Sequence, residues 1–293
     1  MSRSAGVVSL VLFLGCVGAA RGSSNPNLPD WMMQAASATG SWGDAKAVVL
    51  LDDTLLTVGP DGKAVERSRV VVKILRPQGR GYAQPVAAFS KDLKLQSFHV
   101  WSIGPDGHHY AMKDNEYIEK GYDDPDMVFV DLREKIAFPP GADPGGIIGW
   151  EVVEQLPSYE TEDGWSFQRS IPVVQGGFEV DLPPGWHQRA EWFHHEAVAP
   201  TEVEPGHFRW AMSNTPAVNL EDVPLSPAWE ALAGRMSVRF ASDDIPDGDA
   251  LWANIGNWYY NLEAPESEGG SDIATAAKAA AGDGDYMARL SKI

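Results

Sequence analysis

Short apolar runs that alternate with polar residues dominate the chain between residues 45 and 240. Apolar stretches at 48–51 and 55–58 lead into Gly59-Pro60-Asp61-Gly62, and β-branched residues resume at 65–74. Proline presets the second position of such a turn, aspartate favours the third, and glycine adopts the positive φ that follows. The same tetrapeptide recurs at 104–107, between apolar runs at 98–103 and 109–112. The pattern therefore predicts two β-hairpins with the same turn.

The same alternation predicts further strands, in which Glu151, Glu154 and Arg169 interrupt apolar residues. These segments are Met127–Leu132, Ile147–Leu156, Trp165–Ile171, Phe178–Leu182, Gln188–Trp192, His207–Met212 and Met236–Phe240. Many short strands separated by turns indicate a mainly β fold. We predict an antiparallel β-sandwich-like domain with short helices at the N-terminal preface and at the C-terminal end.

Helical patterns are confined to the two ends of the chain. Pro29 and Asp30 are suited to the first turn of a predicted helix at 31–36. Residues 247–263 carry an apolar stripe, formed by Leu251, Ile255, Trp258, Tyr259 and Leu262. Such a stripe requires burial, so we expect this helix to be docked and ordered, buried by the β-rich domain alone or together with a neighbouring domain.

The segments after this helix are less apolar. Residues 265–270 are predicted as a linker, and Ser271-Asp272 could cap a helix through Ala281. An apolar-periodic stretch begins again at Tyr286. Because residues 271–293 bring little apolar area to offset their ordering entropy, we expect them to be loosely held.

The first residues have the pattern of a secretion signal. Arg3 gives a short basic start, residues 7–14 are apolar, and Gly18-Ala19-Ala20 supplies the small residues that signal peptidase reads. The apolar stretch is shorter than the roughly 20 residues that span a bilayer. We predict a signal peptide, 1–20 or 1–22, a periplasmic or secreted protein, and no stable membrane span after cleavage. An acylated Cys16 is the alternative, which the large Phe13 and Leu14 fit poorly.

Cysteine content and charge exclude several functions. Cys16 is the only cysteine of the chain, so cleavage leaves no thiol nucleophile, thiolate metal site or disulfide. The net charge is −18, and removal of a signal with two arginines and no acid makes it more negative. A chain of this charge repels phosphate backbones, which excludes nucleic acid as a partner.

Several candidate sites fail on spacing. His194 and His195 are adjacent, and neighbouring side chains on a strand point to opposite faces, so they do not share a metal. The acidic loops at 123–126 and 243–249 lack the terminal Glu of a helix-loop-helix calcium site and are expected to be solvated loops or weak calcium ligands. Glu151 and Glu154 would face opposite sides of a strand and cannot form a glycosidase pair.

Serine, glycine and tryptophan patterns add no catalytic motif. Ser158, Ser166 and Ser170 lack a Gly-x-Ser-x-Gly elbow, and the glycine pairs at 145–146 and 176–177 are not followed by a phosphate-binding helix. The chain has 11 tryptophans, which either build a sandwich core or form platforms that stack on sugars. We therefore assign no catalytic, cofactor-binding or metal-binding residue, and no cofactor.

An ordered set of residues runs along the chain and comprises Pro29-Asp30-Trp31, Ala47–Leu51 with Asp53, the first hairpin, residues 69–75, Val100-Trp101 with the second hairpin, residues 164–168, Pro172, Pro183-Pro184-Gly185-Trp186 and Trp210. This set resembles a bacterial exported family known as domain of unknown function 3857. The resemblance covers residues 45–240. It implies that the module precedes a transglutaminase-like domain of cysteine-protease fold, whose Gly-Asp-Cys-Lys-Asp-type motif is absent here.

The resemblance implies a domain organisation. Residues 1–22 are the signal peptide, 23–44 a helical preface, 45–240 the β-rich domain, and 241–293 a helical connector to a missing transglutaminase-like domain. The chain resembles a member truncated before its catalytic part. The expected function is a non-catalytic accessory module of such a domain. The alternatives are a stand-alone module that binds envelope glycans or peptides, and a hydrolase that uses carboxylates.

The absence of cysteine after residue 16 generates a first prediction. Purified residues 23–293 should show no amidase or transglutaminase activity that iodoacetamide abolishes, because no thiolate is present to attack a carbonyl. Activity is to be assayed with and without alkylation. Turnover that alkylation removes from a preparation free of contaminating enzymes would contradict this prediction.

Overall fold

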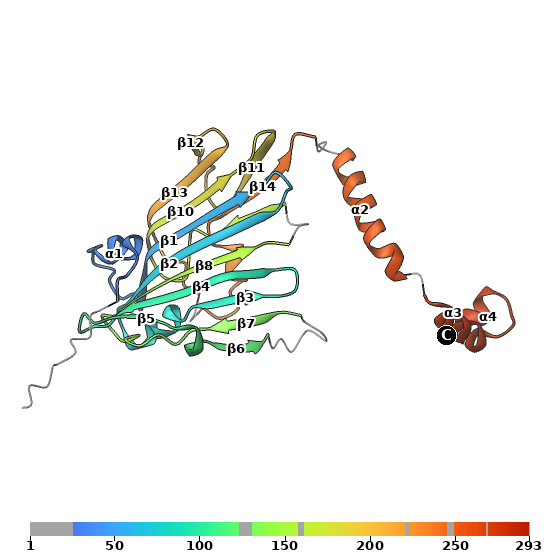
Figure 1. Cartoon of the computed structure of the whole chain (residues 1–293), viewed down its shortest axis with the longest axis horizontal. Helices are drawn as coiled ribbons and strands as arrows, with labels where there is room; N and C mark the ends of the chain where they lie inside the picture. The colour runs from blue at the N-terminus through green and yellow to red at the C-terminus, as the bar shows by residue number, and fades with distance from the viewer. Residues whose placement is uncertain are drawn as a thin grey trace, which may run out of the picture.

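The computed structural model describes residues 26–122, 131–157, 161–220, 223–244, 249–267 and 269–292, so the predicted signal peptide lies outside the described residues. Its centre is an eight-stranded sheet (Figure 1). In spatial order, the strands are β12 (Thr201–Glu204), β13 (His207–Thr215), β10 (Val173–Asp181), β1 (Ala47–Val58), β2 (Ala64–Ile74), β8 (Ile147–Gln155), β4 (Lys94–Ile103) and β5 (His109–Ala111). Neighbouring strands are antiparallel except β1 and β10, which are parallel.

Two small sheets cover one face of this large sheet, which we call the inner face. One contains β11 (Trp186–Phe193), β14 (Arg235–Ser242) and β9 (Glu162–Trp165), and the other β3 (Val86–Phe89), β7 (Arg133–Ile136) and β6 (Ile118–Gly121). Each small sheet closes its own apolar core against the inner face, one around Phe98 and Val72, the other around Phe178 and Phe240. The prediction of a mainly β, antiparallel, sandwich-like domain is confirmed.

Both predicted hairpins are present and use the same turn. Gly62 and Gly107 have φ of 77° and 80°, the left-handed conformation that glycine adopts without steric cost. The amide of Gly59 donates to the carbonyl of Lys63 at 2.8 Å, and that of Gly104 donates to His108 at 2.8 Å. The turn tetrapeptide therefore fixes the local chain direction in both places.

A β-bulge in β1 decides which residues reach the inner face. The register with β2 shifts between Val49 and Leu51, so that Asp52 lies opposite Val70. After the bulge, Asp52 and Leu56 lie on the same face as Val49. The bulge thus places a carboxylate among the apolar side chains of the inner face.

Helix α1 (Asp30–Ala36) packs on the opposite, outer face. Met32 is fully buried there among residues such as Val48, Val71 and Ile147. A Cβ atom at Gly149 would lie 2.7 Å from the Met32 Sδ, so a side chain there would have to displace Met32. The helix and strand β8 are therefore matched in shape.

Two predicted strands differ from the structure. Only residues 162–165 of the region around Trp165–Ile171 form a strand, because residues 166–171 cross from the small sheet of β9 to β10 of the large sheet. Residues 127–130 of the predicted strand 127–132 lie outside the described residues, and residues 131 and 132 are not in a strand.

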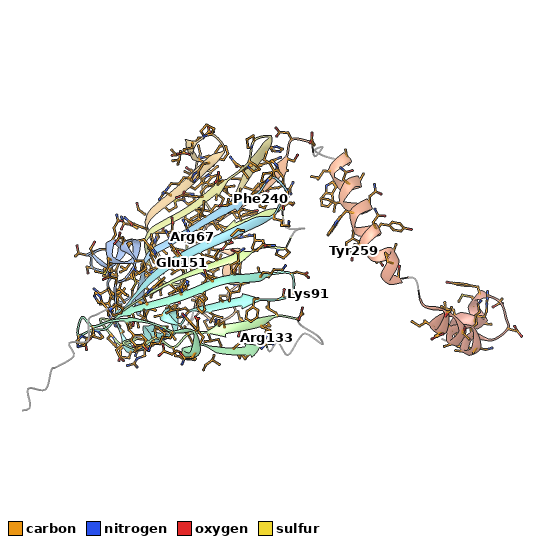
Figure 2. All side chains as sticks on the ribbon, in the orientation of Figure 1. Arg67, Lys91, Arg133, Glu151, Phe240 and Tyr259 are labelled. Atoms are coloured by element: carbon orange, nitrogen blue, oxygen red, sulfur yellow. The ribbon has the colours of Figure 1, made fainter. Side chains whose placement is uncertain are left out.

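The C-terminal helices also differ from expectation. Helix α2 (Asp249–Ser267) continues through Pro265, so the predicted linker 265–270 begins too early. Its apolar stripe is not docked: Tyr259 is 59% exposed and Leu262 58% exposed, and Figure 2 shows Tyr259 apart from the sheets. Helices α3 (Ser271–Ala281) and α4 (Tyr286–Leu290) contact each other. None of the described helices has the length and hydropathy that a bilayer crossing requires.

The packing of α1 generates a second prediction. Met32→Ala should lower the free energy of unfolding by about 2–4 kcal/mol, because it leaves a cavity between the helix and the sheet. Urea denaturation followed by tryptophan fluorescence measures this. The matched control is Met33→Ala on the exposed side of the same helix, which should change stability by less than about 0.5 kcal/mol. Equal effects of the two variants would show that α1 is not packed as described.

Candidate functional site

The gap between the two small sheets leaves part of the inner face uncovered and forms a cleft. Two adjoining cavities of about 560 and 420 Å³ make up the cleft. They share five lining residues, which are Val70, Val86, Trp150, Ser166 and Arg169. A cleft of this size, with apolar walls and a few polar groups, is typical of a ligand-binding site.

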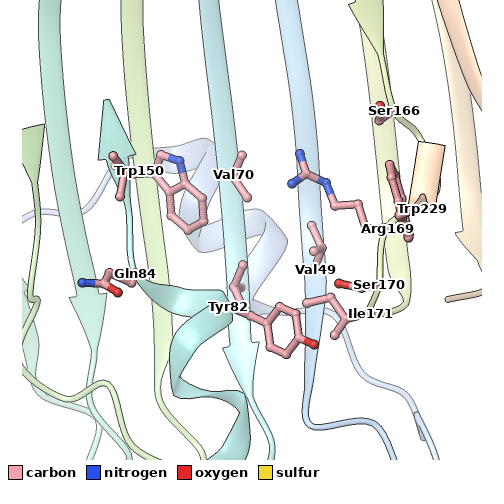
Figure 3. A pocket seen from close by; sticks show the side chains of 12 residues that line it. Val49, Val70, Tyr82, Gln84, Trp150, Ser166, Arg169, Ser170, Ile171 and Trp229 are labelled. Carbon is pink, nitrogen blue, oxygen red and sulfur yellow. The ribbon is translucent and has the colours of Figure 1, made fainter. Parts of the chain in front are cut away.

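The first cavity has mainly apolar and aromatic walls. Its other lining residues are Val49, Val72, Tyr82, Gln84, Ser170, Ile171 and Trp229. Figure 3 shows the Arg169 guanidinium pointing over the sheet toward Val70 and Trp150. Trp229 donates its indole N–H to the carbonyl of Val218 at 3.1 Å, so the wall that it forms is held in place.

An ion pair lies at the junction of the two cavities. Arg169 donates from Nε to Asp52 Oδ2 at 2.6 Å and from Nη2 to Asp52 Oδ1 at 2.8 Å. The Asp52 side chain is only 5% exposed, whereas that of Arg169 is 41% exposed. A buried carboxylate needs such a bidentate partner, and the exposed side of the guanidinium retains donors that face the cleft.

The second cavity is acidic. Glu66 of β2 and Glu154 of β8 lie directly opposite each other in the register of the two strands, and both line the cavity. Asp163 of β9 is hydrogen-bonded to Glu66. The remaining wall is formed by small polar and aliphatic residues, among them Thr54, Ser68, Ala88 and Val152.

Burial changes the protonation of these acids. It raises the pKa of Glu154 from 4.5 to about 7, with no opposing contribution from a neighbouring cation. Burial also raises the pKa of Asp163, and hydrogen bonds from Glu66 and from the Gly164 amide partly oppose this shift. Desolvation disfavours the charged carboxylate, so Glu154 holds its proton up to about pH 7.

On the outer face of the large sheet, acidic side chains form ion pairs with basic ones. Glu151 accepts a hydrogen bond from Arg69 Nε at 2.6 Å, and Glu179 accepts hydrogen bonds from Arg209 and His207 at 2.7 Å each. Arg67 and Glu151 lie on neighbouring strands of this face (Figure 2). These acids are therefore paired with bases across the sheet.

The residues considered from sequence are dispersed. His195 packs its ring against Phe167 and Trp192, while His194 occupies a left-handed turn at φ 54°. Among the described residues, no three His, Asp or Glu side chains lie close enough to hold a metal. Asp243 contacts His187 at 2.9 Å, and the acidic loop at 123–126 lies outside the described residues.

Glu151 and Glu154 do face opposite sides of the sheet, as predicted from their spacing. Ser166 and Ser170 line the cleft, and Ser158 lies outside the described residues. Trp165 and Trp210 are only 4% and 1% exposed, so these two tryptophans pack in the core. The most exposed described tryptophan is Trp252 on α2.

Sequence reasoning missed Asp52 and Glu66 as cleft residues, and Asp163 as the hydrogen-bond partner of Glu66. The position of Asp52 inside the apolar segment 47–58 could have indicated a buried ion pair, because a charge at the centre of a buried strand requires a partner. Its partner Arg169, 117 positions later, carries no local signal. Only the fold brings the two together.

Comparisons with known proteins identify the relatives of this chain. A family model described as a Domain of Unknown Function with solved structure (DUF3857) matches residues 60–219, more than half of the chain. A search of curated proteins found no match. A crystal structure described as a "putative protease" from Parabacteroides distasonis is similar at a TM-score of 0.60 and 19% identity. It matches 84% of this chain, which spans about half (48%) of that protein.

Two further solved structures are less similar. An M1 zinc metallopeptidase from Deinococcus radiodurans matches 67% of this chain and 43% of its own, with a TM-score of 0.35 and 11% identity. Yeast LTA4 hydrolase in complex with bestatin matches 72% of this chain and 33% of its own, with a TM-score of 0.33 and 12% identity.

The raised pKa of Glu154 generates a third prediction. The folded state holds the Glu154 proton up to about pH 7, whereas the unfolded chain releases it near pH 4.5. The folded protein therefore binds more protons between these values, and its stability falls as pH rises through about 7. Glu154→Gln should be as stable as the parent at pH 4 and about 1–2 kcal/mol more stable at pH 8, after allowance for solvent screening.

Urea denaturation at pH 4, 6 and 8 measures this difference. The control is Glu204→Gln, on the exposed edge strand β12, which should follow the parent at every pH. A Glu154→Gln variant less stable than the parent at pH 8 would show that the carboxylate has a partner that stabilises its charge.

Proposed function

This chain belongs to the DUF3857 family, and from that premise we propose that it is a non-catalytic exported module that holds an extended peptide in its inner-face cleft. In longer proteins, the module would present that peptide to a transglutaminase-like domain fused to it. The observation that carries the proposal is the cleft itself, whose walls combine apolar side chains with hydrogen-bonding groups.

The edges of the small sheets favour a peptide as the occupant. Strand β9 is the edge of one small sheet and β3 the edge of the other, and both contribute residues to the cleft. Edge strands offer backbone N–H and C=O groups to an added strand. Gly164 of β9 has no side chain, and a Cβ atom there would meet no neighbour nearer than 3.8 Å, so no side chain at this position obstructs a peptide.

The composition of the cleft favours binding without catalysis. The described residues that line the cleft include no histidine, lysine or cysteine, so Ser166 and Ser170 have no general base of these types beside them. The proposal that a second domain performs the chemistry is supported by the family resemblance. It is also supported by the length of the Parabacteroides protein, of which this chain covers 48%.

Peptide display tests this function and gives the fourth prediction. Random 12-residue peptides selected on residues 23–293 should bind the parent and fail to bind Ser166→Trp, because Ser166 is exposed and borders both cavities, so an indole there fills the cleft. Ser213→Trp on β13 is the matched control, since Ser213 is exposed and does not line the cleft.

Mass spectrometry of the bound peptides completes the experiment. The peptides should be recovered intact, as expected of a binding module. Binding that survives in Ser166→Trp would place the site elsewhere, and cleavage of the peptides would overturn the non-catalytic assignment.

A further inference from the structure

We infer, resting on the proposed peptide-binding function, that the second cavity of the cleft is a subsite for a primary ammonium group, that is, for a lysine-type side chain of the bound peptide. We call this cavity the ammonium subsite. Its defining residues are Glu66, Glu154 and Trp165, which line it. Asp163 is hydrogen-bonded to Glu66.

The placement of the two glutamates is the first argument. Directly opposed residues of an antiparallel pair have Cβ atoms about 4.5–5.5 Å apart, and like charges at that spacing destabilise the sheet. Glu66 and Glu154 occupy such a position, and the described residues that line the cavity include one cation, Arg169, already engaged by Asp52. Above about pH 7, where Glu154 is ionised, a cation from a ligand would offset the repulsion between two ionised glutamates.

A buried donor without a partner is the second, independent argument. Trp165 lines this cavity and is 4% exposed, and within the described structure its indole Nε1–H has no hydrogen-bond partner. Its ring lies beside Gly176, next to the backbone of Asp52. A buried N–H group that makes no hydrogen bond lowers the stability of the fold. A carbonyl oxygen of a bound peptide would accept a hydrogen bond from it.

The shape and lining of the cavity select the class of side chain. The cavity has an aliphatic and aromatic wall formed by Val70, Val86, Ala88, Trp150 and Val152 before its acidic end is reached. A lysine-type side chain has this composition, an apolar stem with a charged tip. A bound divalent metal is disfavoured, since no cluster of three ligating side chains exists among the described residues.

Protonation should couple to this binding. The charged groups that line the subsite are Glu66 from β2, Glu154 from β8 and the Asp52–Arg169 pair, and Asp163 from β9 is hydrogen-bonded to Glu66. An ammonium group favours the ionised carboxylates, so its binding should strengthen as pH rises and the acids lose their protons. The lysine amine itself stays charged until about pH 10.

Defined peptide mixtures test the ammonium subsite and give the fifth prediction. Acetylated hexapeptide amide mixtures with the third residue fixed as lysine or norleucine are compared by equilibrium dialysis against residues 23–293. Norleucine has the same stem without the charge. The lysine mixture should bind about tenfold more tightly at pH 8, the effect of a charge-assisted hydrogen bond. This preference should be several-fold smaller at pH 5.5.

Two variants keep the result interpretable. Glu154→Gln and Glu66→Gln should each reduce the lysine preference to less than about threefold, as expected when one charged acceptor is lost. Glu204→Gln, outside the cleft, should retain it. A preference that survives both cleft variants would overturn the subsite.

The test separates this inference from the proposed function. If both mixtures bind the parent equally and Ser166→Trp abolishes both, the cleft binds peptides and the ammonium subsite is wrong. If neither mixture binds the parent, both the proposed function and the subsite are overturned.

Discussion

The ion pair between Asp52 and Arg169 joins the centre of the large sheet to the segment that crosses from the small sheet of β9 to β10. A carboxylate buried at 5% exposure would be costly without its bidentate partner, so the pair holds the crossing segment against the inner face. That segment supplies Ser166, Ser170 and Ile171 to the cleft wall. The β-bulge of β1 is the local cause, since it is what turns Asp52 inward.

The cleft exists because two separate sheets, and not one continuous sheet, cover the inner face. Each closes its own apolar core, and the strip of large sheet between them stays accessible. The division also leaves β3 and β9 as edge strands at the cleft. Exposed edges are sites of unwanted strand pairing unless a fold protects or uses them, and here both edges contribute to one cavity system.

Two glutamates on β8 lie on opposite faces of the sheet, one in an ion pair and the other in the cleft. Glu151 on the outer face is paired with Arg69 at 2.6 Å and contributes to a ladder of matched charges. Glu154 lies three residues later on the inner face, where it is largely buried and no cation lowers its pKa. Burial therefore raises the pKa of Glu154 to about 7. The period of two along a strand places chemically identical side chains in opposite environments. This contrast distinguishes the cleft acids from the many acids of a chain with net charge −18.

Local features were readable from the sequence because they depend on neighbouring residues. The two turns of Gly-Pro-Asp-Gly type, the alternation within strands, helix α1 and the opposite facing of Glu151 and Glu154 all follow from backbone preferences and periodicity. The exposed stripe of α2 was expected to be docked, because amphipathicity indicates a face that requires burial without identifying the surface that covers it. The cleft was decided by tertiary structure alone. Asp52 and Arg169 are 117 positions apart, and Glu66 meets Glu154 through strand register, which no short window of sequence encodes.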